Sequence, residues 1–327
     1  MISLSKSHFL RKTSTTDISF TDSHPNRQSG QALLIILLVL AVSLTVVLST
    51  ASKSITDVQT SGLEEDSLRA FNAAEVGIEE ALIQQTAPVD ETFDNNASYS
   101  VDVTEASPAL NEFVHPAKFL AGDTATFWFA SQNDEGVLSC ASGLPCLTGN
   151  SMTLCWGNSG VAIPQDKIPA VEVSVFYDSA YPAAVASGNY SGVKVGRAAY
   201  DPNGARRGLN NFSATGNCNA AGNLLGPTNK SFPYRATFTF DSVGARCRGN
   251  RGCLLMARVK FLYNNTAEQA VGIQTSQFGP ALPPQGAEIE STGVAGDSTR
   301  KINVYQSYGE IPSIFDSAVI SKGSLVK

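Results

Sequence analysis

The sequence contains few of the residues from which enzyme active sites are built. Charged residues make up 16% of the chain, and there are three histidines, three methionines and two tryptophans among 327 residues. After Gly30 the one histidine is His115, and neither a G-x-S-x-G nor an H-E-x-x-H motif occurs. We therefore predict that the protein is not an enzyme and holds no cofactor and no metal. We expect His115 to lie in a surface loop.

Basic charge is also scarce. The formal net charge is −6 and is unevenly placed, because in residues 1–30 Lys6, Arg11, Lys12 and Arg27 outnumber Asp17 and Asp22. The remainder is acidic, with one basic cluster at Arg246, Arg248 and Arg251. We interpret this cluster as a solvated turn before a strand; the alternative is a site for an acidic partner such as a cell-surface polymer or DNA. A protein that binds nucleic acid carries a basic stripe that neutralises phosphates. The charge distribution argues against a nucleic-acid partner.

Proline is missing between Pro25 and Pro88, and one apolar run lies in this interval. Ala32–Leu48 has 17 residues without a charge, and only Ser43 and Thr45 are polar. As a helix it would cover roughly 26 Å, close to the thickness of a bilayer's hydrocarbon core. The basic residues before it predict a cytoplasmic N-terminus. No later stretch is long and apolar enough to span again, so we expect a single-pass protein anchored in membrane lipid.

The helical pattern continues past the apolar run. Apolar residues recur with a period near 3.6 up to about residue 85, and acidic residues occupy the other faces. We predict a helix over residues 31–85 that ends before Pro88 and packs one face on protein. The residues expected on this packing face are Leu68, Phe71, Ala74, Ile78 and Leu82.

The cysteines occur only between residues 140 and 253, in a part of the chain expected outside the cell. They are Cys140, Cys146, Cys155, Cys218, Cys247 and Cys253. An even number in an exported domain predicts three disulfides, and six cysteines allow 15 pairings. Two pairs are six residues apart in sequence and could each close a small loop. No C-x-x-C motif and no nearby histidine suggest zinc.

From about residue 97 the periodicity changes to the alternation typical of strands. Short β-branched and aromatic runs, separated by turn residues, predict strands at 97–103, 124–130, 151–156, 170–177, 234–240, 254–263 and 301–305, with one more near 193–200. Residues 179–231 read mostly as long loops, and a linker is expected near 279–287. We predict an α+β protein with a leader over 1–30, a helix over 31–85 and a β-rich, disulfide-bonded extracellular domain over 86–327.

Two motifs in the N-terminal quarter carry a family resemblance. Residues 27–34, R-Q-S-G-Q-A-L-L, resemble the cleavage region of type III signal sequences, the class found in type IV pilins and pseudopilins. Residues 67–79, S-L-R-A-F-N-A-A-E-V-G-I-E, resemble the A-F-x-A-A-E-A-G-x-E stretch of PilX-like minor pilins. The resemblance covers about residues 25–85. It implies that prepilin peptidase cuts between Gly30 and Gln31, and that Gln31 becomes the N-methylated first residue.

One departure from the pilin pattern refines the prediction. Most pilins carry Glu at the fifth mature position, where this chain has Ile35. Some initiating minor pilins and K-type pseudopilins also lack this Glu. The resemblance therefore implies a minor subunit of a type IV pilus or a related secretion filament, not a repeating shaft subunit. Its partners would be prepilin peptidase, other pilin subunits and the membrane assembly platform, with an exposed domain for assembly initiation or contact with a surface ligand.

Two other interpretations remain open from the sequence. The first is a signal-anchored surface protein that never enters a filament and whose β-rich domain binds a ligand, with Ile35 as an ordinary lipid-facing residue. The second is a membrane-tethered hydrolase with an unrecognised site, because Asp and Glu are plentiful but no spacing singles out an acid–base pair. A cleaved signal peptide fits less well, because the helical pattern does not end at Ala51.

Overall fold

We analysed a computed structural model of the chain. It describes residues 29–84, 86–108, 111–132, 136–160, 162–218, 231–247, 249–275, 282–310 and 312. The chain divides into two compact units, residues 1–62 and 63–327. The leader predicted over 1–30 lies almost entirely outside the described residues.

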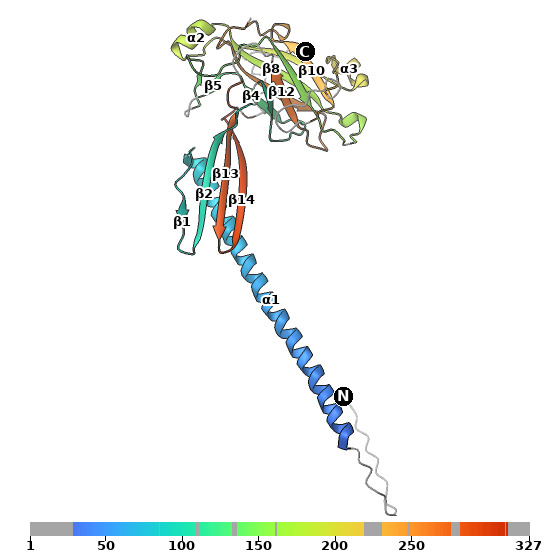
Figure 1. Cartoon of the computed structure of the whole chain (residues 1–327). Helices are drawn as coiled ribbons and strands as arrows, with labels where there is room; N and C mark the ends of the chain where they lie inside the picture. Colours follow the sequence, from blue (N-terminus) through green and yellow to red (C-terminus); the bar gives the residue numbers. More distant parts are fainter. Residues whose placement is uncertain are drawn as a thin grey trace, which may run out of the picture. The chain divides into compact units, whose positions relative to one another are not determined.

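Helices and strands follow the order that the sequence pattern predicts, a long helix and then many strands (Figure 1). The helices are α1 (Ser29–Gln84), α2 (Tyr181–Ser187) and α3 (Gly204–Asn210), with 3₁₀ turns at Gln165–Lys167 and Asp241–Val243. The strands are β1 (Glu91–Thr92), β2 (Ala97–Glu105), β3 (Glu112–Val114), β4 (Thr124–Trp128), β5 (Ser131–Gln132), β6 (Leu138–Ser139), β7 (Ser151–Trp156), β8 (Ala170–Asp178), β9 (Val193–Tyr200), β10 (Tyr234–Thr239), β11 (Leu254–Leu262), β12 (Val271–Thr275), β13 (Gly286–Ala295) and β14 (Ser298–Ser307).

The second part of α1 packs on a four-stranded antiparallel sheet, within the unit formed by residues 63–327. The strand order is β1-β2-β13-β14, so the first strand pair after the helix is joined to the last two strands of the chain. Figure 1 shows β2, β13 and β14 side by side along this part of α1. We call residues 63–105 and 286–307 the helix–sheet module. Its core contains Ala70, Ala73, Ile78, Ala81, Ala97, Tyr99, Val101, Ile289 and Ala295.

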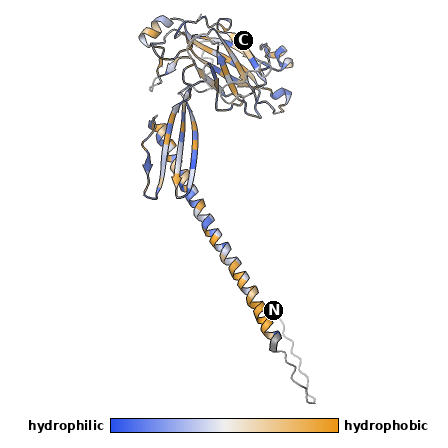
Figure 2. Ribbon diagram, in the orientation of Figure 1, coloured by the Kyte–Doolittle hydropathy of each residue, from blue (hydrophilic) through white to orange (hydrophobic). Residues whose placement is uncertain are grey.

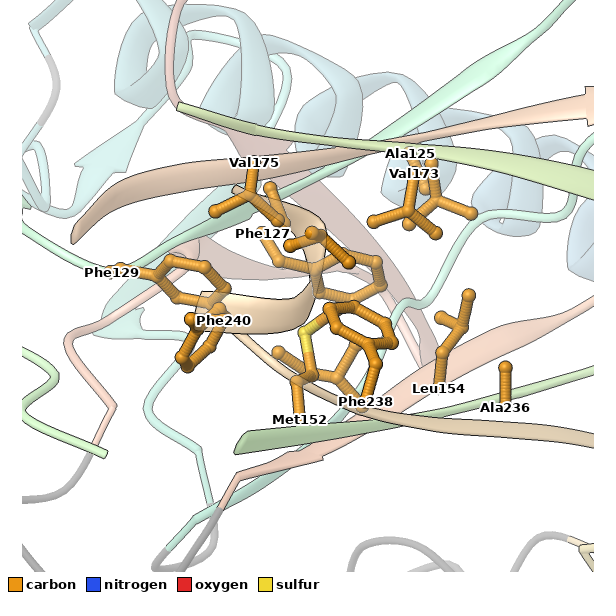
Figure 3. Close-up of a cluster of buried hydrophobic side chains, with 14 of the residues drawn as sticks. Ala125, Phe127, Phe129, Met152, Leu154, Val173, Val175, Ala236, Phe238 and Phe240 are labelled. Atoms are coloured by element: carbon orange, nitrogen blue, oxygen red, sulfur yellow. The ribbon is translucent and has the colours of Figure 1, made fainter. Parts of the chain in front are cut away.

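Residues between β2 and β13 form a second assembly, which we call the sandwich (residues 106–285). Its two four-stranded sheets have the orders β10-β7-β12-β3 and β4-β11-β8-β9. Side chains of both sheets meet in one hydrophobic core, because alternate residues of each strand point inward. Figure 3 shows Phe127, Val173 and Val175 facing Met152 and Phe238 in this core.

The sandwich is an insertion between two neighbouring strands of the helix–sheet module. The chain leaves the module after β2 and returns before β13, and these two strands pair along nine residues from Ala97↔Ala295 to Glu105↔Ala287. At the crossing point the Ala106 N–H donates to the Gly286 carbonyl (2.9 Å), and the Gln285 N–H donates to the Ala106 carbonyl (3.0 Å). The predicted linker near 279–287 contains this return, and its described residues 282–285 are largely buried.

The α+β class is confirmed at the level of one long apolar helix followed by a β-rich region with three disulfides. All eight predicted strands are present, two of them (β7 and β9) with the predicted bounds and six with shifted ends. The sequence pattern did not predict β13, whose G-A-E-I-E-S-T-G-V-A contains two glycines and few β-branched apolar residues. The short strands β1, β3, β5, β6 and β12 were not predicted either, and α2 and α3 were expected to be loops. Each has only seven residues, too few to show a helical period.

Candidate functional site

Residues 33–48 of α1 present a helix surface that is almost entirely apolar. The side chains of its large apolar residues from Leu33 to Leu48 are 55–64% exposed. Figure 2 shows the strongest hydrophobic colour over this stretch. The two polar side chains are satisfied within the helix, because the Ser43 hydroxyl donates to the Leu40 carbonyl (2.9 Å) and the Thr45 hydroxyl donates to the Val42 carbonyl (2.8 Å). Neither hydroxyl therefore needs a hydrogen bond from water, which the hydrocarbon core of a bilayer does not supply.

Among the described residues, α1 is the one helix long and apolar enough to cross a membrane. This is compatible with the predicted single-pass anchor. The helix begins at Ser29, so Gly30 and Gln31 stand at its first turn. The proposed cleavage between these two residues stays a prediction, as do methylation of Gln31 and a cytoplasmic N-terminus.

From residue 63 onward, α1 buries a face of small residues on the sheet. Ala70, Ala74 and Ala81 are fully buried, and Ala73 and Ile78 nearly so. The structure corrects the packing face predicted from sequence. Ala74 and Ile78 are buried as expected and Leu82 is half-buried, but Leu68 and Phe71 are exposed. The prediction followed the largest apolar side chains, whereas the sheet lies so close to the helix that only small side chains fit between them.

Two glycines show how close the helix and sheet come. A Cβ added to Gly293 of β13 would overlap the Ala70 carbonyl and lie 2.7 Å from the Ala74 nitrogen. A Cβ added to Gly77 of the helix would lie 2.5–2.9 Å from side-chain atoms of Ser291, Val101 and Tyr99. The stretch A-F-N-A-A-E-V-G-I-E, which carries part of the family resemblance, therefore has a packing role. Its small residues form the surface on which β13 rests.

Polar contacts fix the helix against two turns of the sheet. Arg69 forms an ion pair with Asp66 and also donates to the Asn95 carbonyl (3.1 Å), in the turn before β2. Asp66 in turn lies against Gly296 in the turn between β13 and β14. On β14, the Arg300 guanidinium donates to the Ser67 hydroxyl from Nε (2.8 Å). These contacts hold the helix in one register on the sheet.

Tyr99 and Glu80 form a further helix–sheet contact. The Tyr99 hydroxyl donates to the Glu80 carboxylate, and the Tyr99 side chain is otherwise buried in the module's core. This hydrogen bond, together with burial, raises the pKa of Tyr99 to about 12. The tyrosine is therefore a donor throughout the physiological pH range, and it ties the middle of β2 to the last turns of α1.

All six cysteines form disulfides, as the sequence predicted. The pairs are Cys140–Cys146, Cys155–Cys218 and Cys247–Cys253. The first and third close loops of the same sequence separation, six residues, whereas the second spans 63 residues. All three lie in the sandwich, and the helix–sheet module contains no cysteine.

One arginine of the basic cluster near the third disulfide has a structural role. Arg251 donates to the carbonyls of Cys140 (2.9 Å), Ala141 (2.7 Å) and Leu144, so the second small disulfide loop holds the first in place. Arg246 is exposed, and Arg248 lies outside the described residues. The structure therefore explains the position of Arg251, one of the two described arginines of this cluster.

His115 is buried, which corrects the expected surface position. It is 8% exposed and lies among aromatic rings, 4.8 Å from the Phe119 ring, 5.5 Å from Tyr305 and 6.2 Å from Phe127 between centroids. The Ala117 N–H donates to its Nδ1 (3.1 Å), so that nitrogen is unprotonated. Burial lowers the pKa of His115 to about 4. A buried neutral histidine that packs among aromatic rings is a core residue.

Asp201 is one of two fully buried acids among the described residues, with Asp178, and its hydrogen bonds explain how its charge is stabilised. Arg206 pairs with it (2.7 Å), Asn210 donates to it (2.9 Å), and the Asn203 N–H donates to it (2.8 Å). Burial alone would raise the pKa of Asp201, but these donors outweigh it and the pKa lies below its ordinary value. Within the described ranges no three Asp, Glu, His or Cys side chains are placed to hold a metal ion.

No family model, no curated protein and no solved structure matches this chain.

Proposed function

We propose that the protein is a minor pilin-like subunit of a type IV pilus or a related secretion filament. Prepilin peptidase would remove residues 1–30, lipid would hold the apolar part of α1, and the sandwich would face the exterior for assembly initiation or surface contact. The observation that carries the proposal is α1 itself. One helix combines a stretch suited to lipid with a stretch whose small residues seat it on an antiparallel sheet.

Two further features support a structural role. The described residues place no group of metal ligands together, and the buried polar clusters at Asp201 and His115 are satisfied by their own neighbours. The disulfides favour an oxidising compartment for the sandwich, because such bonds persist there and are rare in the cytosol. A subunit exposed outside the cell membrane meets this condition.

The mature N-terminus tests the proposal. Mass spectrometry of the protein from its host should find a chain that begins at N-methylated Gln31. A Gly30→Phe variant should keep its leader and migrate as a larger form, while Ser29→Ala serves as a matched control that is still processed. A chain that begins at Met1 or Ser52 would contradict the proposal.

Ile35 favours one alternative, a signal-anchored surface protein that stays outside any filament. An uncharged fifth position is what an ordinary lipid-facing helix carries, since a buried Glu is costly in a bilayer unless it has a partner. Fractionation separates the two proposals. A filament subunit should appear in sheared extracellular filaments with other pilins, whereas an anchored protein should remain with the membrane.

A further inference from the structure

The face of α1 turned away from the sheet is both apolar and acidic. In the unit of residues 63–327, Leu68 is 63% exposed, Phe71 42% and Val76 41%. Leu68 and Phe71 lie one turn apart, so their side chains are neighbours on the helix surface. Glu64, Glu75 and Glu79 are exposed on the same side, by the 3.6-residue period that buries Ala70, Gly77 and Ala81 on the opposite side.

The carboxylates on this face lack cations of their own. Arg69 lies at the border of the face, where it is engaged by Asp66, with Glu65 3.9 Å away. In the part of the chain that the structure describes, no Lys or Arg lies within ion-pair distance of Glu64, Glu75 or Glu79. On the side of the helix that packs on the sheet, Tyr99 donates to Glu80 and Arg300 donates to Ser67.

We infer that this acidic–apolar face is a docking surface for a different subunit whose facing surface carries Lys or Arg beside apolar side chains, and that it excludes a second copy of this chain. The inference rests on the proposed function, because it names the kind of neighbour that the subunit takes in a filament. The apolar side chains supply the area to be buried, and the three glutamates select which surface can cover them.

Two copies that met through this face would bring like charges together in an interface that excludes water. If two copies met through this face, carboxylates of one would approach carboxylates of the other while Leu68 and Phe71 lost their water. Juxtaposed like charges at an interface oppose association and suppress the wrong partner, so they work against the burial of Leu68 and Phe71 between two copies. A basic partner turns the same charges into attraction. The face thus combines attraction for one class of neighbour with rejection of its own copy.

Engineered complementarity tests this directly in the full-length chain in detergent. All six native cysteines are paired, so Phe71→Cys adds the one free thiol. The F71C chain is mixed with a second chain that also carries E64K, E75K and E79K, and cross-links are formed with a short bis-maleimide reagent. We expect the mixed dimer to exceed either homodimer by on the order of tenfold at low salt, and to fall toward them in 1 M NaCl.

Two control chains locate the effect. A thiol at Ser100, an exposed position on the other side of β2, should show no preference for the reversed partner. A neutral E64Q/E75Q/E79Q chain with F71C should form more homodimer than the F71C chain alone, because the repulsion is gone and the apolar side chains remain.

The inference is overturned if F71C cross-links to itself as readily as to the lysine-bearing chain. It is also overturned if no mixture cross-links above the Ser100 control, since a docking surface should accept an engineered complement. Neither result depends on cleavage between Gly30 and Gln31, so failure here is distinct from failure of the proposed function. In the host, the lysine-bearing chain should be processed normally but lost from filaments.

Discussion

The Gln285 side chain hydrogen-bonds both main-chain groups of Trp128. The Trp128 N–H donates to Gln285 Oε1 (2.8 Å), and Gln285 Nε2 donates to the Trp128 carbonyl (2.9 Å). Trp128 lies on β4, the edge of one sandwich sheet, and Gln285 is the last residue before β13. One buried amide thus replaces a neighbouring strand at this edge, directly before the chain returns to the helix–sheet module.

Replacing Gln285 with Leu should lower the free energy of unfolding by about 3 kcal/mol, because two buried backbone groups lose their partners. Both tryptophans of the chain, Trp128 and Trp156, lie in the sandwich, so urea unfolding followed by tryptophan fluorescence reports on it. The matched control is Gln274→Leu, whose amide bonds the half-buried Glu112 and should cost less than about 1 kcal/mol. Equal effects of the two substitutions would show that the Trp128 contact does not matter.

Helix–sheet packing predicts opposite effects for two glycines of α1. Gly77→Ala should destabilise the helix–sheet module by about 2 kcal/mol, because the new methyl group meets Ser291, Val101 and Tyr99. Gly62→Ala should increase helix stability by up to about 1 kcal/mol, because nothing lies within 4 Å and alanine is the better helix former. Thermal unfolding followed by circular dichroism at 222 nm compares them. A stabilising Gly77→Ala would contradict the close packing.

His115 predicts a loss of stability in acid. The pKa of the folded state is about 4, below the ordinary 6.5, so the unfolded chain takes up the proton first as the pH falls. The contribution of His115 to the free energy of unfolding is therefore fully present above pH 6.5. It decreases by about 3 kcal/mol as the pH falls from 6.5 to 4. Urea unfolding of wild type and His115→Leu at several pH values measures it. The variant should lack this part of the slope, and an unchanged slope would assign it to other groups.

The disulfides should differ in their contribution to stability. By the loop-entropy relation, the Cys155–Cys218 bond contributes about 4 kcal/mol and each six-residue loop about 2 kcal/mol. Replacing both Cys155 and Cys218 with Ala should therefore destabilise the sandwich about twice as much as replacing both Cys140 and Cys146 with Ala. Urea unfolding of the two variants gives the ratio. The reverse order would mean that the small loops, held by Arg251, matter more than chain entropy.

The insertion predicts that the sandwich can be removed. Replacing residues 107–284 by Asn-Gly joins two strands that already pair, through the turn type that suits a hairpin. The shortened chain should keep its helical circular dichroism signal and a cooperative unfolding transition, because the core of the helix–sheet module contains no sandwich residue. A chain that aggregates or loses cooperativity would show that the Gln285 and Tyr305 contacts are required for folding.

The sequence by itself determined the features that depend on neighbours along the chain. The apolar run, the long helical period, most of the strands and the oxidised state of the cysteines follow from local pattern and composition, because period and polarity are written in consecutive residues. The longest strand that was not predicted, β13, has a polar and glycine-rich sequence that suits the close approach of the helix at Gly293.

Only the tertiary structure decided which parts meet. β2 pairs with β13 across the entire sandwich, as in Tyr99↔Gly293, and no local signal marks a partner so far along the chain. The same holds for His115, which is a loop residue by sequence but is enclosed by rings from distant strands. On α1, the distance to the sheet reversed the expected order. Small residues are buried, while Leu68 and Phe71 remain on the acidic face, because side-chain size decides packing only once the partner's position is known.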